Sequence, residues 1–176
     1  MSVIFEIPNM STLKLLALCV VLLATVFDFA LSEPKRYRVV HTGSTFYIET
    51  EQKYNWFQAL HECARRGYKL AELQDKQKTL DLELVMQSYL DKPFNLWLGA
   101  NDEFNSKQDY KRPFYWSFSG KRMTYSKWSR DNPDNYKNNE HCVHIWTERE
   151  RFAWNDLDCT KKLGYVCEDK PSKVSS

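Results

Sequence analysis

The sequence predicts an α+β fold, and three observations support this prediction. Two segments in the first half of the chain, 56–66 and 79–90, carry apolar residues at helical spacing. After residue 95 the pattern changes to short aromatic and β-branched runs separated by polar turns, which is typical of strands. Of the 5 cysteines, all but Cys19 lie beyond residue 32, and the even number that remains indicates disulfides formed in an oxidising compartment.

Each predicted helix has an apolar stripe and an end signal. The first, 56–66, ends before Gly67, and glycine is common just after a helix. Its apolar positions are Trp56, Ala59, Leu60 and Cys63. The second, 79–90, is followed by Pro93, which cannot continue a helix. Its apolar positions are Leu80, Leu84, Met86 and Tyr89.

The predicted strands are short and lie mostly in the second half of the chain. Their ranges are 45–48, 114–116, 142–146 and 165–167. The ends of the mature chain, 33–36 and 170–176, are expected to be disordered tails. No repeat, low-complexity tract or heptad pattern occurs, so residues 37–169 are expected to form one domain.

The N-terminus predicts a secreted protein. An apolar run at 15–27 follows Lys14, and Ala30-Leu31-Ser32 supplies small residues at the spacing that signal peptidase needs. The run is shorter than the ~20 residues of a membrane-spanning helix. We therefore expect residues 1–32 to be a cleaved signal peptide, with no stable membrane anchor.

The charge of the mature chain excludes some classes of partner. Loss of residues 1–32 removes Lys14, Glu6 and Asp28, which leaves 24 of the 25 basic residues and 21 of the 23 acidic ones. This net charge of about +3 is too small to indicate nucleic acid or an anionic membrane as a partner.

Side-chain oxygens gather in three nearby clusters: Asn132-Pro133-Asp134, Glu140 and Asn155-Asp156. Ca²⁺ takes about six to eight oxygen ligands in irregular geometry, so loops can supply them. Pro133 fixes one backbone dihedral and can present its two neighbours from one turn. Carboxylates and amides without a Cys–His ligand set favour a hard cation over zinc. The clusters therefore predict a calcium site.

These clusters belong to a longer series of landmarks. The series consists of Cys63, Leu96-Trp97-Leu98-Gly99, Trp128, Asn132-Pro133-Asp134, Glu140-x-Cys142, Trp154-Asn155-Asp156, Cys159 and Cys167. In order and spacing it resembles the C-type (calcium-dependent) animal lectins, in particular the short secreted lectins of insects, over residues 37–169. Cysteine number alone allows three pairings. The resemblance implies the bridges Cys63–Cys167 and Cys142–Cys159, in a domain of two helices, short antiparallel sheets and a long calcium-binding loop region.

The resemblance also implies a sugar-binding site. The positions that match the family's principal calcium site are Asn132, Asp134, Glu140, Asn155 and Asp156. In the family, two vicinal sugar hydroxyls complete the calcium shell and hydrogen-bond to the same side chains. A second calcium site of some members is expected to be absent, because Ser106 and His141 stand where acids are expected. Asp102, the acid that remains there, is expected to cap a turn.

The residues around Pro133 indicate the sugar. Members with Gln-Pro-Asp bind galactose-like sugars, and Asn132-Pro133-Asp134 has the same order of amide and acid. Asn132 is one methylene shorter than that glutamine. Tyr136 stands where galactose-type members carry a stacking aromatic ring. The expected partners are glycans with terminal galactose or N-acetylgalactosamine, on glycoproteins or microbial surface polysaccharide, and the expected role is innate immune recognition by a monomer or weak homo-oligomer.

Catalysis and protein recognition are two other classes of function. An enzyme is not expected, because the chain has no Gly-x-Ser-x-Gly, P-loop or His-Glu-x-x-His motif. The main alternative is a domain of the same fold that binds a protein ligand, with calcium absent or only structural. Binding that disappears with EDTA distinguishes a sugar site from such a surface.

Overall fold

A computed structural model describes residues 33–40, 42–104, 111–147 and 152–171. The predicted signal peptide, 1–32, lies outside these residues, and all elements below lie within Pro34–Ser176. The elements are, in chain order, β1 (Lys35–Arg38), β2 (Thr45–Tyr54), α2 (Trp56–Arg65), β3 (Lys69–Leu70), α3 (Lys76–Tyr89), β4 (Leu96–Asn101), β5 (Tyr115–Trp116), the 3₁₀ helix η1 (Tyr136–Asn138), β6 (Cys142–Trp146), β7 (Ala153–Leu157) and β8 (Leu163–Glu168). No helix in this part of the chain is both long enough and apolar enough to span a bilayer.

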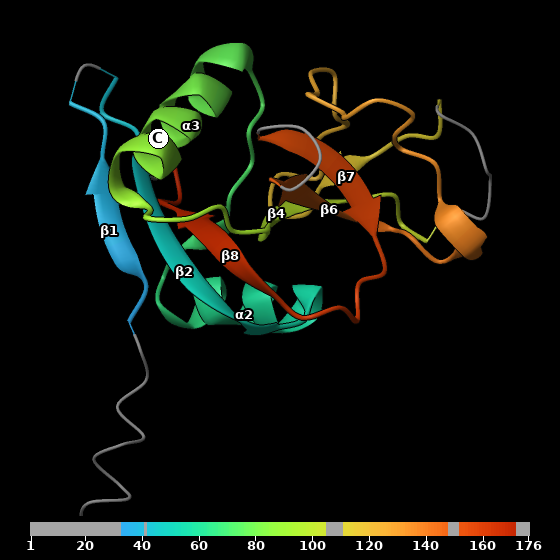
Figure 1. Cartoon of the computed structure of the whole chain (residues 1–176), viewed down its shortest axis with the longest axis horizontal. Coiled ribbons are helices and arrows are strands. Elements are labelled where there is room, and N and C mark those ends of the chain that lie inside the picture. Colours follow the sequence, from blue (N-terminus) through green and yellow to red (C-terminus); the bar gives the residue numbers. More distant parts are fainter. Residues whose placement is uncertain (1–32, 41, 105–110, 148–151, 172–176) are drawn as a thin grey trace, which may run out of the picture. The chain divides into compact units, whose positions relative to one another are not determined.

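The strands form one mixed sheet in the order β1-β2-β8-β4-β6-β7, with β3 on β8 and β5 on β4. Only the β4–β8 pair is parallel. The sheet therefore brings the C-terminal strand between β2 and β4, in the middle of the domain. The loop that carries η1 lies at the end of the domain remote from β1 (Figure 1).

The two helices cover opposite faces of the sheet (Figure 1). Alternate side chains of a strand point to opposite faces, and Phe46 and Ile48 of β2 pack in a core with Leu82 and Val85 of α3. Tyr47, the residue between them, packs in a second core with Trp56, Ala59 and Cys63 of α2. The sheet thus has two hydrophobic cores, one under each helix.

Helix α2 confirms its prediction in detail. Asn55 caps its N-terminus and forms a capping box with Gln58. Trp56, Ala59 and Cys63 are its buried residues. After the helix, Gly67 adopts φ +81°, a left-handed conformation that glycine accommodates readily.

Helix α3 exists where it was predicted, but of its four predicted core residues only Met86 is buried. It begins earlier, at Lys76, because the Asp75 side chain caps it by accepting from the Lys78 N–H. Leu80, Leu84 and Tyr89 are 45%, 48% and 66% exposed. The side chains that face the core are Thr79, Asp81, Leu82, Val85 and Met86. The sequence pattern favoured Leu80 and Leu84, which are four residues apart on the solvent-facing side, over Leu82 on the buried side.

The strand predictions were correct in part. The run at 142–146 is β6, and those at 45–48 and 165–167 lie within β2 and β8. The predicted disordered tail at 33–36 was wrong for Lys35 and Arg36, because they pair with Ile48 and Tyr47 of β2. The predicted disorder at 170–176 concerns residues that lie almost wholly outside the described part of the chain.

Both disulfides have the predicted pairing. Cys63–Cys167 links α2 to β8 across a sequence separation of 104, and Cys142–Cys159 links β6 to the turn after β7 across 17 residues. The second bridge follows Glu140 and Asp156 closely in sequence, so it ties the segment after Asp156 to the start of β6.

Candidate functional site

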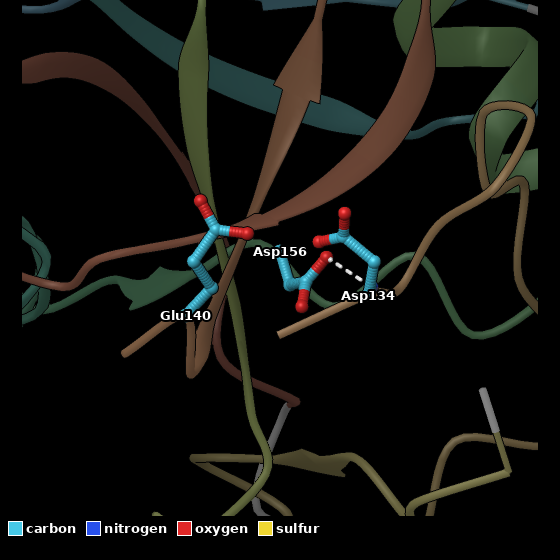
Figure 2. A group of neighbouring side chains, drawn as sticks. All are labelled: Asp134, Glu140 and Asp156. Atoms are coloured by element: carbon cyan, nitrogen blue, oxygen red, sulfur yellow. Dashed lines mark hydrogen bonds between the residues drawn. The ribbon is translucent and has the colours of Figure 1, made fainter. Parts of the chain in front are cut away.

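Three carboxylates from separate parts of the sequence meet at one place. Asp134 precedes η1, Glu140 precedes β6, and Asp156 lies in β7; Figure 2 shows their carboxyl groups turned toward one another. One ligand oxygen of each lies within 4.8 Å of the others. The structure therefore brings together the three acidic residues of the predicted calcium site.

Strand β7 supplies Asn155 and Asp156 to the site. Its pairing with β6 places Asn155 opposite His144 and Asp156 opposite Val143. Asp156 is fully buried, and its Oδ1 accepts from the Asp134 N–H over 3.1 Å while Oδ2 accepts from the Asn135 N–H over 2.8 Å. One carboxylate thus holds the backbone of the loop that carries the other ligands.

Asn135 organises that loop from within. It is buried and has φ +49°, a left-handed conformation that asparagine tolerates better than most residues. Its Oδ1 accepts from the Glu140 N–H over 3.0 Å. The Tyr136 N–H donates to Asp134 Oδ1 and to Glu140 Oε2. Sequence reasoning missed Asn135, and its signal was an asparagine in a turn directly after the Asn-Pro-Asp motif.

The two predicted amide ligands, Asn132 and Asn155, line the same hollow as Asp134 and Glu140, and the Asn132–Pro133 peptide is cis. Asn132 Nδ2 donates to Ser129 Oγ over 2.7 Å. Asn155 Nδ2 lies 3.2 Å from His144 Nε2. Since each amide nitrogen contacts a protein group, the carbonyl oxygen is the atom that each side chain offers to a cation.

The electrostatics of the site also fit a cation. Burial, together with the charges of Asp156 and Asp134, raises the pKa of Glu140 to about 8. A bound cation relieves such crowding of negative charge. All five predicted side chains offer oxygen, the ligand atom that calcium prefers over zinc. The residues present therefore fit a calcium ion.

Asp102 is the acid that remains where some family members have a second calcium site, and the structure shows its contacts. Its Oδ1 accepts from the Phe104 N–H over 3.0 Å, which confirms the predicted turn cap. Its carboxylate also contacts His141 Nδ1 and pairs with Arg112. Arg112 was not considered from sequence. Ser106 lies outside the described residues.

Two of the three carboxylates and both amides border a small hollow with a volume of about 180 Å³, lined by Asn132, Asp134, Tyr136, Glu140, Trp146 and Asn155. Tyr136 is 60% exposed, as a ring that contacts a ligand must be. Trp146, at the end of β6, is partly buried. Sequence reasoning treated Trp146 only as a strand residue. Its alternation with Ile145, which is buried in the core, was the signal that it faces outward.

Comparison with known proteins agrees with the fold. Residues 52–169 match the family described as Lectin C-type domain. The chain is 48% identical over 126 residues to "Lectin subunit alpha" of Sarcophaga peregrina, covering 72% of this chain and 44% of the relative. It is 33% identical over 121 residues to "Salivary C-type lectin 2" of Aedes albopictus, covering 65% of this chain and 77% of the relative. The chain thus spans less than half the length of the Sarcophaga protein.

Solved structures show the same fold. The C-type lectin CEL-I from Cucumaria echinata superposes with a TM-score of 0.60 at 22% identity, covering 71% of this chain and 89% of CEL-I. At this level of identity the likeness concerns the arrangement of helices and strands alone.

Proposed function

Because this chain belongs to the C-type lectin family, we propose that it binds carbohydrate through one calcium ion and prefers galactose-type sugars. The chain is accordingly a binding protein, not an enzyme. The observation that carries the calcium proposal is the convergence of Asp134, Glu140 and Asp156, whose ligand oxygens lie within 4.8 Å of one another.

The proposed ligands are the three carboxylates and the carbonyl oxygens of Asn132 and Asn155. A bound calcium ion would offer coordination positions to two vicinal hydroxyls of a sugar. The carboxylates of Asp134 and Glu140 accept hydrogen bonds from those hydroxyls, and the asparagine amides can donate. Asp156 is buried beneath them and fixes the loop, so its part is to bind the ion rather than to touch the sugar.

Two features support the preference for galactose-type sugars. Asn132 precedes Asp134, which gives the amide-first polarity of galactose-binding members of the family. The hollow also has two aromatic side chains at its border, Tyr136 and Trp146. Galactose has its C–H groups gathered on one face of the ring, and such a face packs on an aromatic side chain. Mannose lacks this continuous apolar face.

The proposed setting is extracellular. Two disulfides favour an oxidising compartment. The proposed partners are glycoproteins or microbial polysaccharides, recognised in innate immunity. A single shallow site holds one sugar weakly, so clustered glycans or assembly of several copies would raise the avidity. The name of the Sarcophaga relative, a lectin subunit, supports assembly with other chains.

The test is binding of the secreted protein to an array of glycans, first in calcium and then in EDTA. We expect binding to terminal galactose or N-acetylgalactosamine that disappears in EDTA. Calcium-dependent binding to mannose or fucose would support the proposed calcium site but refute the proposed sugar preference. Folded protein without any calcium-dependent sugar binding would refute the proposal and favour the protein-ligand alternative.

Variants of the two aromatic residues separate the sugar contacts from the ion. We expect Trp146→Ala and Tyr136→Ala each to weaken galactose binding about tenfold, the loss of roughly 1.4 kcal/mol of packing. Calcium affinity should change little, because neither side chain is a ligand. Tyr89→Ala is the matched control, since Tyr89 is 66% exposed on α3. Unchanged galactose binding in both site variants would refute the role of the aromatic rings.

A further inference from the structure

Arg112 is a buried cation at the base of the candidate site. Its side chain is 0% exposed, and its guanidinium lies 4.8 Å from the centre of the Phe114 ring. Nε donates to Asp102 Oδ2 over 2.8 Å, and Nη2 donates to the Glu140 carbonyl oxygen over 2.9 Å and to Asp156 Oδ2. One side chain therefore joins the segment after β4, the segment before β6, and β7.

The chemistry of arginine suits this position. A guanidinium keeps its proton in proteins, and its planar fork can bond several oxygens at once. Burial of an unpaired charge is costly, but here Asp102 and Asp156 both balance it. Arg112 is therefore a permanent positive charge that contacts Asp156, one of the three clustered carboxylates, at the same Oδ2 that accepts from the Asn135 N–H.

The contacts continue from Arg112 to the ligands. Asp156 holds the N–H groups of Asp134 and Asn135, and the Asn135 side chain holds the N–H of Glu140. Each of these hydrogen bonds joins two protein groups, so none of them requires a bound ion. The arrangement of the loop over 132–140 thus depends on the orientation of Asp156, and Arg112 and the loop amides together fix that orientation.

We infer that Arg112 is a positioning residue for the proposed calcium site: an internal cation that holds Asp156 and loop 132–140 in the binding arrangement before calcium arrives. This inference rests on the proposed function. Its consequence is that removal of calcium ends sugar binding without opening the loop. A loop organised only by the ion would open in EDTA.

Hydrogen exchange of the peptide that covers 132–140 tests this directly. The amides of Asp134 and Asn135 donate to Asp156 of β7, and the amide of Glu140 donates to Asn135 within the loop, so exchange of these amides reports opening of the loop. For the native chain we expect exchange in EDTA to remain within about twofold of that in calcium. A rise of about tenfold or more in the native chain on adding EDTA would overturn the inference, whatever the variants do.

Arg112→Met, which keeps the length of the side chain, should raise exchange of this peptide about tenfold in EDTA, and calcium should restore the protection. Arg112→Lys keeps a charge but has no fork, so it should recover only part of the protection. Arg122→Met is the matched control, since Arg122 is exposed, and it should behave like the native chain.

The outcomes separate this inference from the proposed function. A general structural role would raise exchange throughout the sheet in Arg112→Met, and calcium would not restore it; that result overturns the inference. If the 132–140 peptide of Arg112→Met exchanges at the same rate as in the native chain, the inference is overturned as well. If Arg112→Met does not fold, hydrogen exchange of the native chain and of Arg112→Lys in EDTA still tests the inference. Calcium titration of the native chain tests the proposed function independently, because exchange in EDTA requires no ion.

Discussion

The imidazole of His144 lies against Asn155 and fixes the orientation of its amide. His144 Nδ1 lies 3.0 Å from the Ile145 carbonyl oxygen and must donate to it, so Nε2 accepts from Asn155 Nδ2 over 3.2 Å. Burial lowers the pKa of His144 to about 4, which keeps the ring neutral at neutral pH. The bond leaves the Asn155 carbonyl oxygen as the atom for the proposed calcium ion.

We expect His144→Phe to weaken calcium binding. The phenyl ring preserves the packing against Trp97, whose ring centre lies 5.8 Å away, but it cannot accept from Asn155. Loss of one hydrogen bond is worth about 0.5–1.5 kcal/mol, or roughly a two- to tenfold decrease in affinity, measured by calorimetric titration with calcium. His61→Phe, at an exposed position of α2, is the control. Equal affinities of the two variants would contradict this role for His144.

The Leu-Trp-Leu-Gly motif ends in a residue that cannot carry a side chain. A Cβ on Gly99 would lie 2.6 Å from the Leu70 carbonyl oxygen, and the Gly99 N–H donates to the Ala71 carbonyl over 2.8 Å. We expect Gly99→Ala to lower the free energy of unfolding by about 1–3 kcal/mol or more, measured by urea denaturation. Gly43→Ala is the comparison, since Gly43 has open space around it and only its φ of +75° opposes a side chain. A smaller loss at Gly99 than at Gly43 would refute the steric explanation.

Much of the fold follows from local patterns in the sequence. Asn55 and Gly67 mark the ends of α2, and its apolar stripe matches the buried one. Strand β7 was missed, because its Asn155-Asp156 pair has low strand propensity and was assigned to a ligand loop. It pairs with β6, the strand that precedes it in the chain, and this pairing fixes the places of Asn155 and Asp156.

The candidate site divides in the same way. The oxygen-rich side chains could be found from sequence, because their residue types and spacing are themselves the signal. Arg112 could not, because it acts through buried contacts with Asp102 and Asp156, which lie elsewhere in the chain. Asn135 had only the weak signal of an asparagine in a turn, because its contacts with Glu140 and Asp156 depend on the fold. A lone arginine before a proline is ordinary at the level of sequence, and only the fold places it beneath Asp156.

The corrected face of α3 can be tested with two leucines. Leu82 is 1% exposed and packs in the core, whereas Leu84 is 48% exposed. We expect Leu82→Ala to lower the free energy of unfolding by about 2–5 kcal/mol, through lost burial and the cavity that remains. Leu84→Ala should change it by less than about 0.5 kcal/mol. Urea denaturation of both variants measures the difference. Similar losses of unfolding free energy would contradict the assignment of Leu82 to the buried face and Leu84 to the exposed one.

A buried carboxylate outside the candidate site, that of Glu72, predicts how stability depends on pH. Glu72 is 0% exposed; its Oε1 accepts from the N–H groups of Phe118 and Ser119, and its Oε2 accepts from Lys69 Nζ over 2.9 Å. Burial alone would raise the pKa of Glu72, but Lys69 and the Ser119 amide together hold it below its ordinary value of 4.5. The resulting stabilisation is complete above the pKa of the unfolded side chain and is lost as the pH falls through the lower pKa of the folded protein.

Glu72→Gln removes this charge without changing the size of the side chain. At about pH 7 we expect a loss of about 1–3 kcal/mol in the free energy of unfolding, because an amide NH₂ cannot accept from Lys69. Below about pH 4.5 the difference between variant and native protein should shrink, since the native carboxylate then takes up a proton. Urea denaturation at both pH values measures it, with Glu51→Gln as the exposed control. A difference that stays constant over this range would show that the Glu72 charge does not contribute to stability.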